Sequence, residues 1–245
     1  MGRRRVLFII LATAACSAAA AGRVGADDHI VTESSRTYMG RTTPPRATET
    51  WLRDGAVAVR SPGTTTIIRF DLKKRWTIVD QNKKYFEEPL EAAAPASSAA
   101  KIRIQEMGFD YEPVFAWTVT ETGDTRTING LACRKVIAQG EADYAEERRE
   151  MWVAGSVAIN LDRHRTLMVE RDTDPTMAEL SRKSPVLTSG IAMETTIVRT
   201  PPIAPEMTWV FRVAKLEGGV TAPAGMYEIP PGYTRAATLD ELFAR

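Results

Sequence analysis

Apolar and polar residues alternate over short stretches along most of this chain, and polar turns separate the stretches. The clearest case is residues 64–89, where three apolar runs are divided by charged turns at residues 73–75 and 81–84. Short alternating runs with such turns are typical of antiparallel strands. The pattern therefore predicts a three-stranded meander.

The middle run of this meander carries apolar groups on both faces. Trp76 and Ile78 point to one face of a strand, and Thr77 and Val79 point to the other. A sheet with one solvated face would alternate more cleanly. We therefore expect both faces to be covered, by an inner helix or a ligand on the concave side of a strongly curved sheet and by loops or termini behind it.

Further strands are predicted on both sides of the meander. Before it, residues 29–39 read as an edge strand, residues 48–60 read as a hairpin around Asp54-Gly55, and residues 61–63 form the next turn. After it, an Asn129-Gly130 pair favours a tight hairpin turn. The later strands are expected at residues 114–120, 127–128, 131–138, 147–153, 191–199 and 209–216.

Helical patterns are few and short. Residues 160–184 form the best candidate, since Asp174 and Pro175 resemble a helix cap followed by proline, and Pro185 is expected to end the helix. Residues 91–100 predict a loop or a weak helix, residues 225–233 a proline-rich closing segment, and residues 239–244 a last helix. This order predicts an α+β fold, a curved antiparallel sheet with short helices against one face.

The first 26 residues have the composition of a secretory signal. Three arginines precede an apolar run over residues 6–15, and small residues then lead to Ala26. The run is shorter than the ~20 residues that a permanent membrane-spanning helix needs. We expect residues 1–26 to be a signal peptide and residues 27–245 to be a single exported, periplasmic domain.

Two processing sites remain open. Cleavage after Ala26 would release a chain that begins at Asp27. The alternative is Cys16, which follows Thr13-Ala14-Ala15 and resembles a lipoprotein box, although Thr13 stands where that motif usually has an aliphatic residue. Lipidation of Cys16 would tether the protein to a membrane, and we expect membrane contact only in that case.

Charge and cysteine content exclude several classes of protein. With the four arginines of residues 1–26 removed, 28 basic residues face 31 acidic ones, a net charge of −3, and no extended basic patch favours nucleic-acid binding. Cys133 is then the single cysteine of the body of the chain, and we expect it to be a buried core residue rather than a reactive thiol.

Residues with catalytic or metal-binding patterns are scarce. His29 and His164 are the only histidines, and neither has a second ligand at metal-binding spacing. There is no nucleophile elbow and no glycine-rich phosphate loop. We therefore expect a protein that is not an enzyme and that uses no cofactor and no metal.

Four motifs resemble a known family of exported bacterial proteins. They are KKYFEEP at residues 83–89, INGLACRK at residues 128–135, EMWVA at residues 150–154 and MYEIPPGY at residues 226–233. Together they resemble a domain of unknown function that is related in fold to the lipoprotein carriers LolA and LolB. The resemblance implies a half-open antiparallel β-barrel with helices as a lid, and a cavity that holds acyl chains or lipids. It carries over no functional residue, and a shared fold is only an analogy for function.

Large apolar side chains fall on the predicted strands and helices, and they support two interpretations. They fill an ordinary core, or some of them line a cavity beneath the helices of residues 160–184. The candidate lining residues are Trp76, Ile78, Trp117, Trp152, Met168, Met177 and Trp209.

The function expected from these patterns is binding or carrying of an apolar ligand, such as a lipid or a lipoprotein acyl chain. The alternative is a structural or interaction module of the cell envelope that has a solid core and contacts another envelope protein. A continuous apolar cavity distinguishes the first from the second.

Overall fold

The computed structural model describes residues 27–90, 115–142, 145–169 and 175–244. The predicted signal peptide with Cys16, the segment at residues 91–100 and the predicted helix cap at Asp174 lie outside these residues. Of the helices described, none is long and apolar enough to cross a membrane.

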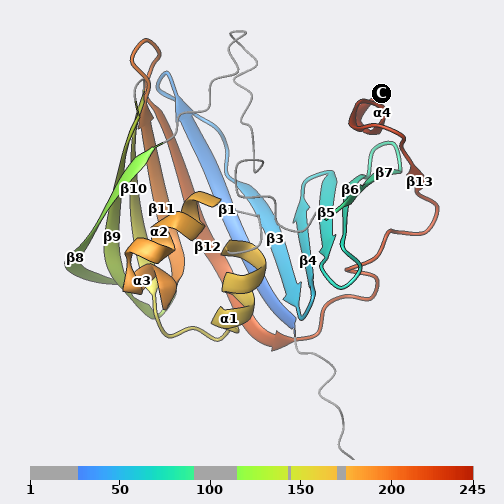
Figure 1. The fold of residues 1–245 in the computed structure, drawn as a ribbon, viewed down its shortest axis with the longest axis horizontal. Coiled ribbons are helices and arrows are strands. Elements are labelled where there is room, and N and C mark those ends of the chain that lie inside the picture. The colour runs from blue at the N-terminus through green and yellow to red at the C-terminus, as the bar shows by residue number, and fades with distance from the viewer. Residues whose placement is uncertain (1–26, 91–114, 143–144, 170–174, 245) are drawn as a thin grey trace, which may run out of the picture.

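The described strands form one large curved sheet that does not close on itself (Figure 1). Its order is β13-β7-β6-β5-β4-β3-β1-β12-β11-β10-β9-β8, with β2 paired to β1 beside this path. All pairs are antiparallel except β13 with β7. The strands are β1 (Asp27–Tyr38), β2 (Arg41–Thr42), β3 (Arg46–Arg53), β4 (Ala56–Ser61), β5 (Thr64–Arg69), β6 (Lys74–Val79), β7 (Lys84–Pro89), β8 (Ala116–Ile128), β9 (Leu131–Ala142), β10 (Ala145–Ala154), β11 (Ile191–Thr200), β12 (Met207–Val220) and β13 (Thr234–Arg235).

Local turn chemistry positions these strands as the sequence predicts. The meander of residues 64–89 is confirmed as β5, β6 and β7. The hairpin between β8 and β9 turns at Asn129 and Gly130, whose φ angles of 50° and 77° are the positive values that a tight primed turn requires. Residues 116–128 differ from prediction, because they form one long strand, β8, with an irregularity between Glu121 and Thr125, rather than two strands.

The prediction of an edge strand at residues 29–39 is wrong. Strand β1 lies inside the sheet, between β3 and β12. Ile30, for example, pairs with Thr50 on one side and with Leu216 on the other. The second partner comes from the far end of the chain, so the local polar composition of β1 could not indicate it.

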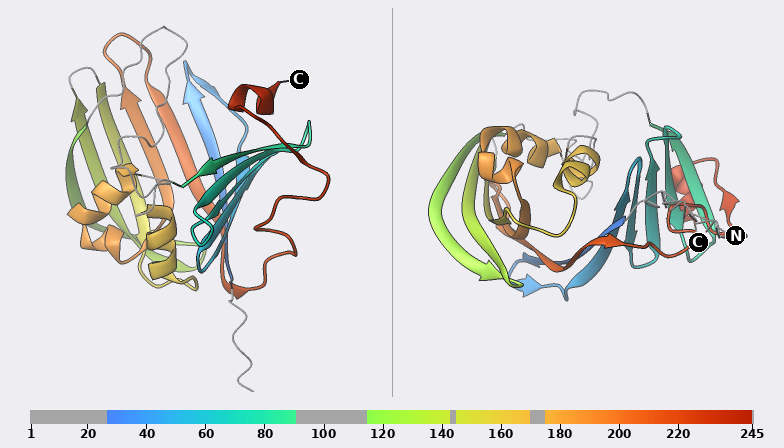
Figure 2. Two further views of the ribbon diagram at one scale, coloured as in Figure 1. Left: turned by 45° about the vertical axis from the view of Figure 1, so that its right-hand side comes forward. Right: turned by 90° about the horizontal axis from the view of Figure 1, so that it is seen from below.

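Short helices lie within the concave side of the β8–β12 half of the sheet (Figure 2). They are α1 (Leu161–His164), a π-helical turn η2 (Arg165–Val169), α2 (Pro175–Lys183) and α3 (Pro185–Thr188). Pro185 does not simply end the helical region as predicted. It is the first residue of α3, a position at which a backbone N–H would have no acceptor within the helix, so that proline, which has no N–H, fits there. The Ser184 hydroxyl caps this helix by accepting from the Leu187 backbone N–H.

The C-terminal segment covers the β3–β7 half of the sheet. Met226 and Tyr227 pack on the face of β6 that carries Trp76 and Ile78. The segment then pairs at the sheet edge as β13, and α4 (Leu239–Phe243) places Leu242 against Val79 on the other face of β6. The expectation that both faces of this strand are covered is confirmed.

A second core lies between the sheet and the helices. Met151 and Val153 of β10 and Leu180 of α2 are essentially inaccessible to solvent there. Cys133 is also fully buried, as predicted, and burial raises the pKa of its thiol above the ordinary value. The helices are thus fixed against one face of the curved sheet.

Candidate ligand cavity

A cavity of about 450 Å³ lies between the helices and the concave face of the sheet. Side chains from α1, η2, α2 and α3 line it on one side, and side chains from β1, β3, β10, β11 and β12 line it on the other. Its apolar walls include Ile30, Leu187, Ile191, Phe211 and Val213. The polar remainder consists of Ser and Thr hydroxyls, His164, Arg149 and Arg165, with no carboxylate among the described lining residues.

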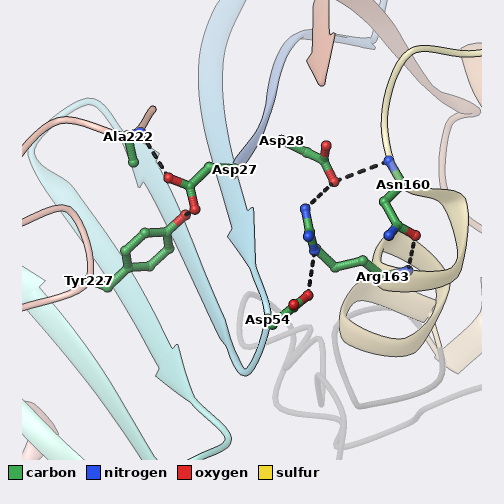
Figure 3. Close-up of polar contacts among 7 residues, drawn as sticks. All are labelled: Asp27, Asp28, Asp54, Asn160, Arg163, Ala222 and Tyr227. Atoms are coloured by element: carbon green, nitrogen blue, oxygen red, sulfur yellow. Dashed lines mark hydrogen bonds and ion pairs between the residues drawn. The ribbon is translucent and has the colours of Figure 1, made fainter. Parts of the chain in front are cut away.

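Two consecutive aspartates hold the layers on either side of β1 (Figure 3). The Asp28 carboxylate points toward the helices and accepts hydrogen bonds from the Asn160 backbone N–H at 3.2 Å and from Arg163 Nη1 at 3.0 Å. Burial raises the pKa of the Asp28 carboxyl above its ordinary value, and the Arg163 guanidinium opposes this shift. These contacts fix α1 at the cavity wall.

The neighbouring Asp27 points to the opposite face of the strand, because successive side chains alternate. Its carboxylate accepts from the Ala222 backbone N–H at 2.9 Å and from the Tyr227 hydroxyl at 3.2 Å (Figure 3). Asp27 therefore anchors the C-terminal segment to the same strand that Asp28 joins to the helices.

A buried charged cluster stands at the cavity wall on β10 and β11. The Glu147 side chain is fully buried and accepts hydrogen bonds from Arg149 Nε at 2.7 Å and from Arg199 Nε at 2.7 Å. The Arg149 guanidinium also lies 5.3 Å from the centre of the Trp117 ring. Of these residues only Arg149 lines the cavity.

His164 contributes a neutral polar group to the wall. It is partly exposed, and as a lining residue it borders the cavity. Burial lowers the pKa of its imidazole to about 4. At neutral pH the ring is therefore uncharged.

The structure places only part of the predicted set of ligand-binding residues at this cavity. Met168 and Met177 line it, from η2 and α2. Trp117 lies behind Arg149 in the core under the helices, and Trp209 lies on the face of β12 that carries Phe211, where Arg36 and Arg199 contact its ring.

The other predicted residues lie elsewhere. Trp152 faces away from the cavity side of β10, with the Arg126 guanidinium 4.2 Å from its ring centre. Trp76 and Ile78 are buried beneath the C-terminal segment, and Trp76 Nε1 donates to Glu87 at 2.8 Å. None of these three lines the cavity, and ligand binding by any of the seven residues stays a prediction.

Sequence reasoning missed Arg149, although a signal for it was present. In residues 147–153, every second side chain faces the core, and Met151 and Val153 are apolar. The same period of two places Glu147 and Arg149 on that face. Within the described residues, no group of three or more His, Cys, Asp or Glu side chains is arranged to hold a metal ion.

Comparison with known proteins gives only distant structural matches. No family model and no curated protein matches the chain. Among solved structures, a DUF1329 family protein from Desulfovibrio piger matches at 11% identity and a TM-score of 0.36, over 84% of this chain and 90% of that one. PNGF-II matches at 9% identity and a TM-score of 0.38, over 87% of this chain but only 32% of that one.

A LolA superfamily protein from Nitrosomonas europaea also matches, at 7% identity and a TM-score of 0.28, over 82% of this chain and 89% of that one. A protein of a domain-of-unknown-function family and a LolA-type protein, the two kinds named in the sequence resemblance, are thus both among the matching structures. Since every one of these TM-scores is below 0.5, we base the functional proposal on the geometry of this chain alone.

Proposed function

We propose that this protein binds or carries an apolar ligand, such as a lipid or an acyl chain, in a half-open β-barrel closed by short helices. The protein acts without catalysis and is exported to the periplasm after removal of residues 1–26. Attachment to a membrane through Cys16 is the alternative form of the same protein.

The observation that carries this proposal is the cavity itself. A space of about 450 Å³, partly open to solvent, lies between the helices and the sheet, within the ~300–1,000 Å³ range of small-molecule sites. Its lining combines eleven apolar or glycine residues with eight polar ones, so that it offers both an apolar surface and hydrogen-bonding groups to a ligand.

The helices give the cavity an adaptable wall. The residues contributed by η2 and α2 include Met168 and Met177, whose flexible thioether side chains fit ligands of varied shape. Ion pairs with the Asp28 and Asp54 carboxylates join Arg163 of α1 to β1 and to the turn between β3 and β4. We expect ligand entry to involve movement of this helical layer.

A pair of variants on β11 tests the proposal. Thr195 lines the cavity, whereas its neighbour Thr196 points to the opposite face of the strand and does not line it. Thr195→Phe should fill part of the cavity and weaken binding of a fatty-alcohol probe at least tenfold. Thr196→Phe is the matched control and should bind as the wild type does.

Binding is measured by tryptophan fluorescence and by native mass spectrometry of residues 27–245, with 1-dodecanol as the probe. A probe that binds wild type and both variants equally would place the ligand elsewhere and contradict the proposal. No binding to the wild type, with a bare chain also recovered from the native envelope, would favour the solid envelope module instead.

A further inference from the structure

The charged cluster at the cavity wall contains more positive than negative groups. Glu147 supplies one carboxylate, and Arg149 and Arg199 supply two guanidinium groups, all on the cavity-facing side of β10 and β11. The cluster therefore carries a net charge of +1. Because a charge shielded from water is costly unless it is paired, the surplus favours an anionic partner at Arg149, whose side chain is less exposed than that of Arg199 (11% against 18%).

Arg149 is the member of the cluster that can reach such a partner. It is 9% exposed and lines the cavity. Within the described part of the chain its guanidinium donates one hydrogen bond to protein, from Nε to Glu147, and the Trp117 ring supports its face at 5.3 Å. Its two Nη groups are therefore held in place with their donors unused by protein.

The surrounding wall favours an anion at this point. The lining residues that the structure describes include no Asp or Glu. Arg165, also on the wall, lies 3.7 Å from Asp162 and adds a second guanidinium to the lining. The imidazole of His164 is neutral and offers a hydrogen bond without competing charge.

We propose that the Nη groups of Arg149 bind the acidic head group, a carboxylate or a phosphate, of an amphipathic ligand whose apolar chain occupies the rest of the cavity. Two parallel N–H donors match the two oxygens of such a group. The inference rests on the proposed function and specifies the class of ligand.

A series of probes with one chain and different head groups tests the inference on the wild type. Dodecanoate and dodecyl phosphate should each bind at least tenfold more tightly than 1-dodecanol, and dodecylammonium should bind more weakly than the alcohol. The stronger of the two acids identifies the head group. Equal affinity for acid, alcohol and amine would overturn the inference while leaving the apolar cavity intact, whereas no binding of any probe would overturn the proposed function too.

A pair of adjacent arginines provides the matched variants. Arg149→Gln should remove the preference for dodecanoate over dodecanol, measured as the ratio of the two affinities. Arg148→Gln alters the opposite face of the same strand, where Arg148 bonds to Glu150, and should keep the preference. A preference retained by Arg149→Gln would overturn the assignment. If that variant does not fold, Arg149→Lys takes its place, because lysine keeps the charge but lacks the paired donors. Arg149→Lys should lower the preference for dodecanoate at least threefold. An unchanged preference would equally overturn the assignment of Arg149 to the head group.

Discussion

Gly140→Ala is expected to destabilise the protein through a single contact. Gly140 of β9 pairs directly with Trp117 of β8, and the tryptophan ring lies over the glycine. A Cβ atom added at Gly140 would lie 2.8 Å from Trp117 Cζ3 and 2.9 Å from both Cε3 and Cη2. Ordinary carbon contacts are ~3.5–4.0 Å, so the ring would have to move away by at least roughly half an ångström.

The magnitude follows from two opposing effects. Overpacking of a buried site costs about 1–3 kcal/mol. Gly140 has no positive φ angle, so alanine fits the backbone there and recovers the ~0.5–1 kcal/mol that glycine loses in a strand. Because Trp117 is only 7% exposed and cannot swing into solvent freely, the clash should dominate. We expect a net loss of about 1–2 kcal/mol in the free energy of unfolding.

Urea unfolding followed by circular dichroism measures this loss. Gly155→Ala is the control, because its new Cβ would lie no nearer than 3.9 Å to another atom, and the variant should be neutral or slightly stabilised. In a Trp117→Leu background, Gly140→Ala should cost nothing, because the clashing ring is gone. Equal cost in both backgrounds, or a Gly140→Ala protein at least as stable as the wild type, would refute the reasoning.

Three further predictions concern titratable groups. Tyr227→Phe loses the hydrogen bond to Asp27 and should lower the free energy of unfolding by about 1 kcal/mol in urea titrations. Burial, and secondly the Asp27 charge, raise the pKa of the Tyr227 hydroxyl, so the stability that this group contributes is present below pH ~10 and is lost as the pH rises further. A Tyr227→Phe protein whose stability has the same alkaline pH dependence as the wild type would contradict this. Burial lowers the pKa of His164 to about 4, so the free energy of unfolding should decline as the pH falls from ~6.5 toward 4. In urea titrations across this range, His164→Gln should flatten the decline. A variant with the same pH dependence as the wild type would show that His164 is not its cause. Cys133 in a chain of residues 27–245 should resist a thiol reagent until the protein unfolds, and rapid labelling of the native protein would show that its burial is transient.

Local sequence chemistry predicts the strand layout well, because turns and alternation act over a few residues. Asn129-Gly130 gives the hairpin where a primed turn is required. The apolar groups on both faces of β6 predict a cover on each, and the C-terminal segment supplies both, with Tyr227 on one face and Leu242 on the other.

Strand partners that are distant in sequence could not be predicted in this way. The local sequence does not specify that β1 pairs with β12, and that pairing decides which residues share the cavity. Trp76 and Trp117 have similar strand contexts, yet one lies beneath the C-terminal segment and the other beneath the helices. Residue type alone therefore does not separate a cavity wall from a packed core.

The two halves of the sheet differ in what covers them, and this difference restricts where a ligand can bind. At β6, in the β3–β7 half, the C-terminal segment packs on both faces of the sheet, and Trp76 and Ile78 are buried beneath it. Over β1, β3 and β10 to β12, short helical segments cover the concave face without filling the space beneath them, and the cavity remains. Asp27 and Asp28 join both covers to one strand, so that loss of either carboxylate should loosen one layer and leave the other attached. The solid-core and cavity interpretations of the sequence thus apply to different parts of the same sheet, and the cavity beneath the helices is the candidate site for a ligand.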